Sequence, residues 1–206
     1  MMYSEYKRLA VKPQERKAWI KYLLRPISTL ISYAIKDVRF ISPNNVTALM
    51  IFLVLFSGVL GIKGYYGLMA ILLISTSILD GVDGELARYR DLVSKDGMAL
   101  DNIYHLICFP SIMTGIGISL NKWAGISAMV VSLMFMANTF MREIVSEGYS
   151  VKKGITYYLG QIDQDHNFNI LVCLGVLLVD IRLLFIAFMV YTFAKSLYIY
   201  FKVGED

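Results

Sequence analysis

Six long stretches of this chain lack Asp, Glu, Lys and Arg, and they constrain its fold more than any other feature. They cover residues 41–62, 64–79, 102–121, 123–141, 167–179 and 183–194. A helix of about 20 residues crosses the roughly 30 Å hydrocarbon layer of a membrane. Helices also satisfy their own backbone polar groups there. The pattern predicts an all-α integral membrane protein with six transmembrane helices.

Composition agrees with this fold class, because 57% of the 206 residues are hydrophobic. A soluble domain of ordinary composition is less apolar. The fifth run is short, so we expect it to extend backwards through residues 157–159 or to sit in a locally thinner bilayer. Asp180 and Arg182 divide the last two runs and predict a tight turn at a membrane face.

Positive charges fall mainly on one side of the six predicted helices. With an internal N-terminus, three of the 20 Lys and Arg residues lie outside, namely Lys63, Lys122 and Arg182, and the remaining 17 lie inside. Lys and Arg are enriched in cytoplasmic loops. We therefore expect a multi-pass protein of the cytoplasmic membrane, with both termini facing the cytoplasm.

Residues 1–40 are predicted to form an interfacial arm, followed by a membrane domain over residues 41–206. Within residues 15–35 cations mix with apolar side chains, which is typical of an amphipathic helix lying against anionic lipid heads. The basic side of this helix, with Arg25 among its cations, is expected to face those heads. Pro26 permits a break. The arm anchors and orients the protein, or it also gates substrate entry.

Three local patterns carry structural expectations. Ser42 is expected to cap a helix that has Pro43 at its first position. Cys108 and Cys173 fall within predicted spans, so we expect small buried residues and not a disulfide or metal clip. The first forty residues do not show the short apolar core of a cleavable signal peptide, and the first span is expected to direct insertion.

Ionisable residues gather where the second predicted helix ends and the third begins. Asp80 and Asp83 are three residues apart, so they point to one side if the second helix continues through them. Gly97, Asp101 and His105 are each four residues apart and share a face of the third helix. Charges beside a bilayer are costly and tend to be functional. We therefore expect three carboxylates and an imidazole around one space.

Such a cluster favours a divalent metal. Neighbouring carboxylates repel one another unless a cation neutralises them, and their hard oxygens suit Mg²⁺, Mn²⁺ or Ca²⁺. Two ions bridged by a carboxylate would clamp a diphosphate. Gly84 and Gly97 would let a base or phosphate approach the backbone. The alternative is that the aspartates only end the helices and pair with Arg88, Arg90 and Lys95.

The spacing of the whole cluster is more specific than its composition. In order it reads Asp80-x-x-Asp83-Gly84-x-x-Ala87-Arg88, eight residues, Gly97, three residues, Asp101, three residues, His105. Up to Asp101 this resembles the signature of the CDP-alcohol phosphotransferase (CDP-alcohol phosphatidyltransferase) family, D-x-x-D-G-x-x-A-R-x8-G-x-x-x-D-x-x-x-D, with seven of eight fixed positions matched. The Pro43-Asn44-x-x-Thr47 opening of the first span resembles the family as well.

This resemblance implies an activity and a set of site residues. Family members transfer a phospho-alcohol from a CDP-alcohol donor to a hydroxyl acceptor and release CMP. They use Mg²⁺ or Mn²⁺, with two ions expected, in a six-helix membrane domain that is often a homodimer. The resemblance assigns metal ligation to Asp80, Asp83 and Asp101. It assigns nucleotide binding to Asn44, Thr47, Gly84, Ala87, Arg88 and Gly97, with Arg88 steadying either the diphosphate or the aspartates.

His105 stands where the family pattern has a fourth aspartate. In the family that aspartate is taken to activate the acceptor and to help hold the second metal. A histidine accepts protons near neutral pH and also ligates metals, although it cannot supply the negative charge. Three interpretations stay open: His105 is a working catalytic base or ligand, it marks a modified activity, or it marks lost catalysis.

The alcohols that are joined are less constrained. A CDP-diacylglycerol-like lipid donor and a small polar acceptor would suit phospholipid biosynthesis in a membrane lipid environment. A soluble CDP-polyol or phosphosugar reaction is the alternative, because the Arg25-Pro26-Ile27-Ser28 stretch faintly resembles members that join inositol phosphates. We expect three cations near a phosphorylated acceptor: Arg142, Lys152 and Lys153. The alternative is that they only follow the positive-inside pattern. The acidic stretch at residues 163–166 is expected to be a solvated loop.

Three other classes of protein could also carry aspartates in membrane helices or resemble this family. A membrane prenyltransferase also binds diphosphate through aspartates and Mg²⁺, but it usually carries two such motifs. A cation or proton transporter would place acids deep within its spans. A catalytically silent relative would bind nucleotide without turnover. Nucleic acid is not an expected partner, because topology and anionic lipid already account for the positive charge.

Overall fold

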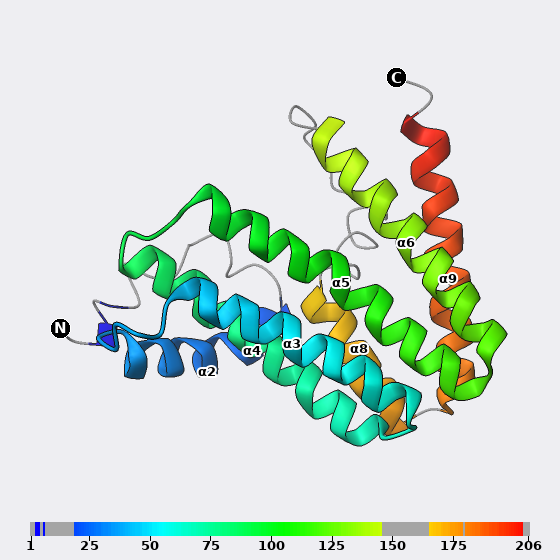
Figure 1. Ribbon diagram of the computed structural model, residues 1–206, viewed down its shortest axis with the longest axis horizontal. Helices are drawn as coiled ribbons and strands as arrows, with labels where there is room; N and C mark the ends of the chain where they lie inside the picture. The colour runs from blue at the N-terminus through cyan, green and yellow to red at the C-terminus, as the bar shows by residue number, and fades with distance from the viewer. Residues whose placement is uncertain (1–2, 5, 7–18, 146–164, 179, 204–206) are drawn as a thin grey trace.

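The computed structural model describes residues 3–4, 6, 19–145, 165–178 and 180–203. Over these residues it is helical and has no strand (Figure 1). The all-α prediction is therefore confirmed. The helices are α2 (Trp19–Ile35), α3 (Pro43–Ile62), α4 (Tyr66–Tyr89), α5 (Lys95–Leu120), α6 (Lys122–Val145), α8 (Asp165–Leu178) and α9 (Ile181–Val203).

Three helices, α3, α4 and α5, are long and apolar enough to cross a membrane by length and composition. Helices α6, α8 and α9 coincide with the last three apolar runs, but within the described residues they do not meet the same standard. Helix α8 has only 14 residues, which is short for a span. Its expected extension through residues 157–159 lies outside the described residues. The six-span count therefore stays a prediction.

Side-chain caps mark the starts of α3 and α5, whereas α4 begins without one. The Ser42 side chain accepts a hydrogen bond from the backbone N–H of Asn45 at 3.1 Å, with Pro43 in the first position of α3, as predicted. Ser94 caps α5 in the same way. At the expected turn, Asp180 Oδ1 accepts from the Arg182 N–H at 2.7 Å. Such caps satisfy the first free N–H groups of a helix.

The core lies where α3, α4 and α5 pack together, with α5 between α3 and α6. Gly58 and Gly115 let α3 and α5 approach closely, because a Cβ on Gly115 would lie 2.4 Å from the Gly58 carbonyl oxygen. Small residues serve this purpose between membrane helices. The largest fully buried apolar side chains of these three helices are Met50, Val54, Met69, Leu73, Leu86, Tyr104, Ile112, Met113 and Ile116.

Helix α8 is tied to the core through buried polar groups. Asn169 donates to the Ser77 hydroxyl of α4 at 2.9 Å, and Cys108 of α5 contacts the Asn169 Oδ1 at 3.6 Å. Cys173 lies 3.3 Å from the Ala70 carbonyl oxygen. Both cysteines are buried and unbridged, as predicted. Beyond α5, helices α6 and α9 run side by side in Figure 1.

Helix α2 packs against α4 with its polar face, which corrects one expectation. It continues through Pro26 without the permitted break. The prediction that Arg25 faces lipid heads is wrong, because its guanidinium pairs with the buried Glu85 carboxylate of α4 at 2.9 Å. A charge partner inside the protein outweighs a solvated lipid surface. The apolar Leu30 is left exposed instead. Whether α2 lies in a membrane interface stays a prediction.

Candidate metal centre and nucleotide site

Helices α4 and α5 bring Asp80, Asp101 and His105 together. Each offers one ligand atom, and these three atoms lie within 4.8 Å of one another. The Nε2 atom of His105 is 3.5 Å from Asp101 Oδ1 and 4.0 Å from Asp80 Oδ1. This happens because α4 does continue through Asp80, and because Asp101 and His105 share one face of α5. Of the three carboxylates and one imidazole expected around one space, two carboxylates and the imidazole therefore meet here.

The donor set fits a divalent cation. Asp101 Oδ1 is buried and has His105 Nε2 at 3.5 Å, but it accepts no hydrogen bond from the residues that the structure describes. A buried carboxylate oxygen without a hydrogen bond is costly, and a cation beside it would remove that cost. Two carboxylates and an imidazole suit metals such as Mg²⁺ or Mn²⁺, with the nitrogen favouring Mn²⁺.

Asp83 lies one helical turn beyond Asp80 but faces α3. It is 8% exposed, and its Oδ2 accepts a 2.6 Å hydrogen bond from the Thr47 hydroxyl. It is not one of the three residues whose ligand atoms converge. Thr47, expected beside the nucleotide, is thus in contact with an expected metal ligand. The hydroxyl fixes the direction of the Asp83 carboxylate.

Asn44 and Gly97 meet where the first turns of α3 and α5 come together. A Cβ built on Gly97 would lie 3.2 Å from Asn44 Oδ1, so a larger residue would push the amide away. The Asn44 side chain is otherwise exposed. Two residues that the motif assigned to the nucleotide, 53 positions apart, are therefore neighbours in space.

Gly84, Ala87 and Arg88 form the next turns of α4. The Arg88 guanidinium lies over Gly84, because a Cβ there would be 3.1 Å from Arg88 Nη1. Ala87 is half-buried on the same helix. A bare backbone next to a guanidinium suits a phosphate, since the guanidinium forms charge-assisted hydrogen bonds with phosphate oxygens.

The contacts of Arg90 test the alternative that the aspartates only pair with nearby basic residues. Its guanidinium donates to four backbone carbonyls of the α2–α3 connection, those of Ile35, Lys36, Val38 and Ile41, at 2.6 to 3.1 Å. These contacts argue against the alternative in which Arg90 pairs with the aspartates. Backbone carbonyls that have left a helix need donors, and Arg90 supplies them. Sequence reasoning missed this role and that of Glu85.

The proposed acceptor cations cannot be placed. Lys152 and Lys153 lie outside the described residues, and the Arg142 side chain is not described. Their expected roles therefore stay predictions. Residues 163 and 164 of the acidic stretch also lie outside the described residues, but Asp165 and His166 begin helix α8, so the expected loop is wrong for these two.

The structure is a bundle of apolar helices, and carboxylates and an imidazole converge from two of them. These features define a membrane protein with a candidate metal centre. The family model described as CDP-alcohol phosphatidyltransferase matches residues 40–203. The chain belongs to the CDP-alcohol phosphatidyltransferase family. The match includes every candidate site residue named above, whereas α2 lies ahead of it. A search of curated proteins finds no match.

Family membership supports a coarse function for this chain. It indicates a transferase of phosphate groups that uses a CDP-alcohol donor and a hydroxyl acceptor. The family is generally dependent on a divalent metal, and the cluster of Asp80, Asp101 and His105 is a possible place for one.

Proposed function

We propose that this protein transfers the phospho-alcohol of a CDP-diacylglycerol-like lipid to a small polar hydroxyl compound, releases CMP and serves phospholipid biosynthesis. The observation that carries the proposal is the convergence of Asp80, Asp101 and His105 at one point between α4 and α5. These residues belong to helices that are apolar enough for a membrane. A lipid donor would thus reach the carboxylates without leaving the bilayer.

Asp80, Asp83 and Asp101 are the proposed ligands for Mg²⁺ or Mn²⁺, with two ions in all. Bound there, the metal would neutralise the diphosphate of the donor and the charge that passes to the CMP leaving group. The protein's own part is to hold the carboxylates in position. Thr47 holds Asp83 from α3, and the spacing along α5 holds Asp101 beside His105.

His105 is the proposed base that accepts the proton of the attacking hydroxyl. A base of this kind must lie within hydrogen-bond reach of the hydroxyl. The Asp101 and Asp80 carboxylates, 3.5 and 4.0 Å from Nε2, would offset the positive charge on the ring after proton transfer. The alternative role is that of a nitrogen ligand to the second metal.

The proposed nucleotide site lies next to this cluster. Its members are Asn44, Thr47, Gly84, Ala87, Arg88 and Gly97. Contact between Asn44 and the start of α5, and the position of Arg88 over Gly84, support a common binding surface. In this proposal Arg88 steadies the diphosphate, while Arg142, Lys152 and Lys153 would attract a phosphorylated acceptor.

The alternative is a phosphosugar or polyol synthase of the same family. The Arg25-Pro26-Ile27-Ser28 stretch favoured it, but Arg25 and Ser28 both bond Glu85. Their presence therefore has a structural explanation, and the lipid reaction is preferred. We also propose six spans, a site that faces the cytoplasm and a homodimer. The positive-charge bias supports the orientation, and exposed apolar residues such as Phe52 offer a surface to lipid or to a second copy.

The test is a reaction of the purified protein with Mg²⁺ or Mn²⁺, a panel of CDP-alcohols and a panel of hydroxyl acceptors. Mass spectrometry of the products is combined with an assay of CMP release. A lipid phosphodiester formed together with CMP supports the proposal. Product formation from a prenyl diphosphate without CMP, cation transport by proteoliposomes without nucleotide, or CDP-alcohol binding without turnover would each point to a rival class.

A further inference from the structure

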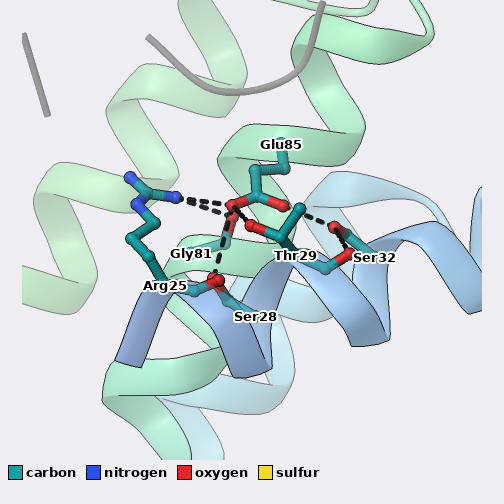
Figure 2. A network of polar contacts seen from close by, with 6 residues as sticks. All are labelled: Arg25, Ser28, Thr29, Ser32, Gly81 and Glu85. Carbon is teal, nitrogen blue, oxygen red and sulfur yellow. Dashed lines mark hydrogen bonds and ion pairs between the residues drawn. The ribbon is translucent and has the colours of Figure 1, made fainter. Parts of the chain in front are cut away.

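Glu85 of α4 is fully buried and is surrounded by polar groups of α2 (Figure 2). Its Oε1 accepts hydrogen bonds from Arg25 at 2.9 Å, Thr29 at 2.9 Å and Ser28 at 3.3 Å. Its Oε2 accepts one from Ser32 at 2.5 Å. We call these five residues the Glu85 network. Four donors on one carboxylate tie α2 to α4 at a single point.

The donors come from one face of α2. Arg25, Ser28, Thr29 and Ser32 follow one another at intervals of three, one and three residues, which aligns them along one side of a helix. Burial of a charged pair is costly, and apolar residues of similar size often give equal or greater stability. The many partners of the buried Glu85 carboxylate are therefore better explained by a need to hold α4 in one position against α2 than by a gain in folding stability.

Gly81 shows how close the two helices come. A Cβ on Gly81 would lie 2.6 Å from both Cβ and Oγ of Ser28, and Arg25 Nη1 lies 3.4 Å from the Gly81 carbonyl oxygen. Gly81 follows the motif residue Asp80 and is two residues before Asp83. Helix α2 therefore touches the backbone of the turn that carries the proposed metal ligands.

Contacts on two sides fix the rotation of this turn. Glu85 is two residues from Asp83, so the two side chains leave α4 about 200° apart around its axis. Glu85 is held by α2, and Asp83 is held by Thr47 of α3. A rotation of α4 that kept one contact would break the other.

We propose that Glu85 is a positioning residue, which uses α2 to set the rotation of α4 and hence the direction of Asp80 and Asp83. Arg25 is its charged partner. The inference rests on the proposed metal site, and it makes α2 part of the catalytic unit although α2 lies outside the family match. Glu85 itself touches neither the donor nor the acceptor.

The main variant is Glu85→Gln, which keeps the side-chain volume and removes the charge. The control is Tyr66→Phe, which removes the 2.5 Å contact with Ser119 about 28 Å from Glu85 along α4. Mn²⁺ affinity is measured by electron paramagnetic resonance without substrate, next to kcat, KM and melting temperature. Partners that orient metal ligands typically matter by about 10- to 100-fold, and we expect Glu85→Gln to lose that much Mn²⁺ affinity and kcat.

Further variants separate positioning from packing. Tyr66→Phe should lower the melting temperature and leave Mn²⁺ affinity and kcat unchanged. Arg25→Lys should keep more Mn²⁺ affinity than Arg25→Gln. The Mn²⁺ affinity of the double variant Arg25→Gln/Glu85→Gln should be no lower than that of the single variant with the lower affinity, because the pair acts as a unit. If Glu85→Gln does not fold, Thr29→Val removes one donor without a change of shape and should weaken Mn²⁺ binding in the same direction.

One result would overturn the inference: Glu85→Gln, or Thr29→Val in its place, with a lower melting temperature but wild-type Mn²⁺ affinity and kcat. The network would then be packing alone. Failure of the proposed function looks different, because the wild-type protein would bind Mn²⁺ but release no CMP. The Mn²⁺ affinities would still decide the role of Glu85 in that case.

Discussion

The hydroxyl of Thr47 and the carboxylate of Asp83 are joined by a 2.6 Å hydrogen bond that links α3 to α4 inside the candidate site. Both residues are buried. A family resemblance alone assigns one to the nucleotide and the other to the metal. Their contact indicates that Thr47 also acts on the metal site, by holding Asp83 in one orientation.

Thr47→Val keeps the shape of this side chain and removes the hydrogen bond. We expect Mn²⁺ affinity to fall by about 10- to 100-fold, the usual effect of losing a group that orients a metal ligand. Thr47→Ser, which keeps the hydroxyl, should retain most of the affinity. The measurement is a Mn²⁺ titration without substrate. Unchanged Mn²⁺ affinity combined with a higher KM for the CDP-alcohol would show that Thr47 acts on the nucleotide alone.

His105→Ala should slow CMP release at neutral pH by about 10²- to 10⁴-fold, the usual contribution of a general base. His105→Asp restores the family residue and should stay active or gain activity. Initial rates of CMP release at saturating metal test both variants. Full activity of His105→Ala with unchanged metal dependence would remove His105 from the mechanism, and an inactive His105→Asp would give histidine a distinct role.

Gly97→Ala tests the contact between α5 and Asn44. The new Cβ would lie 3.2 Å from Asn44 Oδ1, so the amide must shift by a few tenths of an ångström. We expect a higher KM for the CDP-alcohol with little loss of stability. The matched control is Gly67→Ala, where a Cβ meets nothing within 4 Å. Equal KM values for the two variants would contradict a nucleotide role for this contact.

Arg90→Met tests the anchoring of the α2–α3 connection. It removes the donors to four part-buried carbonyls at Ile35, Lys36, Val38 and Ile41, and carbonyls shielded from water lose stability when their donors are removed. We expect faster hydrogen exchange over residues 35–45 and a lower melting temperature. The control Arg39→Met changes an exposed arginine of the same connection. Equal exchange in the two variants would mean that Arg90 does not hold the connection.

Local sequence signals predicted the parts of the fold that depend on neighbours in the chain. The Ser42 cap with Pro43 and the shared face of Asp101 and His105 follow from spacing along one helix, and both are present. The limits of the apolar runs were a poorer guide. Helix α4 continues ten residues past its run, through Asp80 and Asp83, because a helix tolerates charges that face other protein groups or water.

Tertiary contacts between distant helices were beyond the reach of the sequence. The pattern of α2 suggests a cationic side toward lipid heads, and nothing in it reveals that Ser28, Thr29 and Ser32 become buried around Glu85. The direction in which a helix docks depends on its partner's surface. Likewise Arg88, Arg90 and Lys95 are similar neighbours of the aspartates in sequence, yet Arg90 serves the backbone of another segment. A buried polar network of this kind is identified only when both helices are seen together.

We propose that Asp80, Asp83 and Asp101 hold the metal that allows CMP release. The most direct measurement is CMP release from a CDP-alcohol by the wild-type protein and by Asp101→Asn, with Mn²⁺ binding followed in the same samples. We expect metal-dependent CMP release by the wild type, and loss of both Mn²⁺ binding and CMP release in Asp101→Asn. Release of CMP by the wild type at full rate in the presence of a strong chelator, or by Asp101→Asn at the wild-type rate, would contradict it.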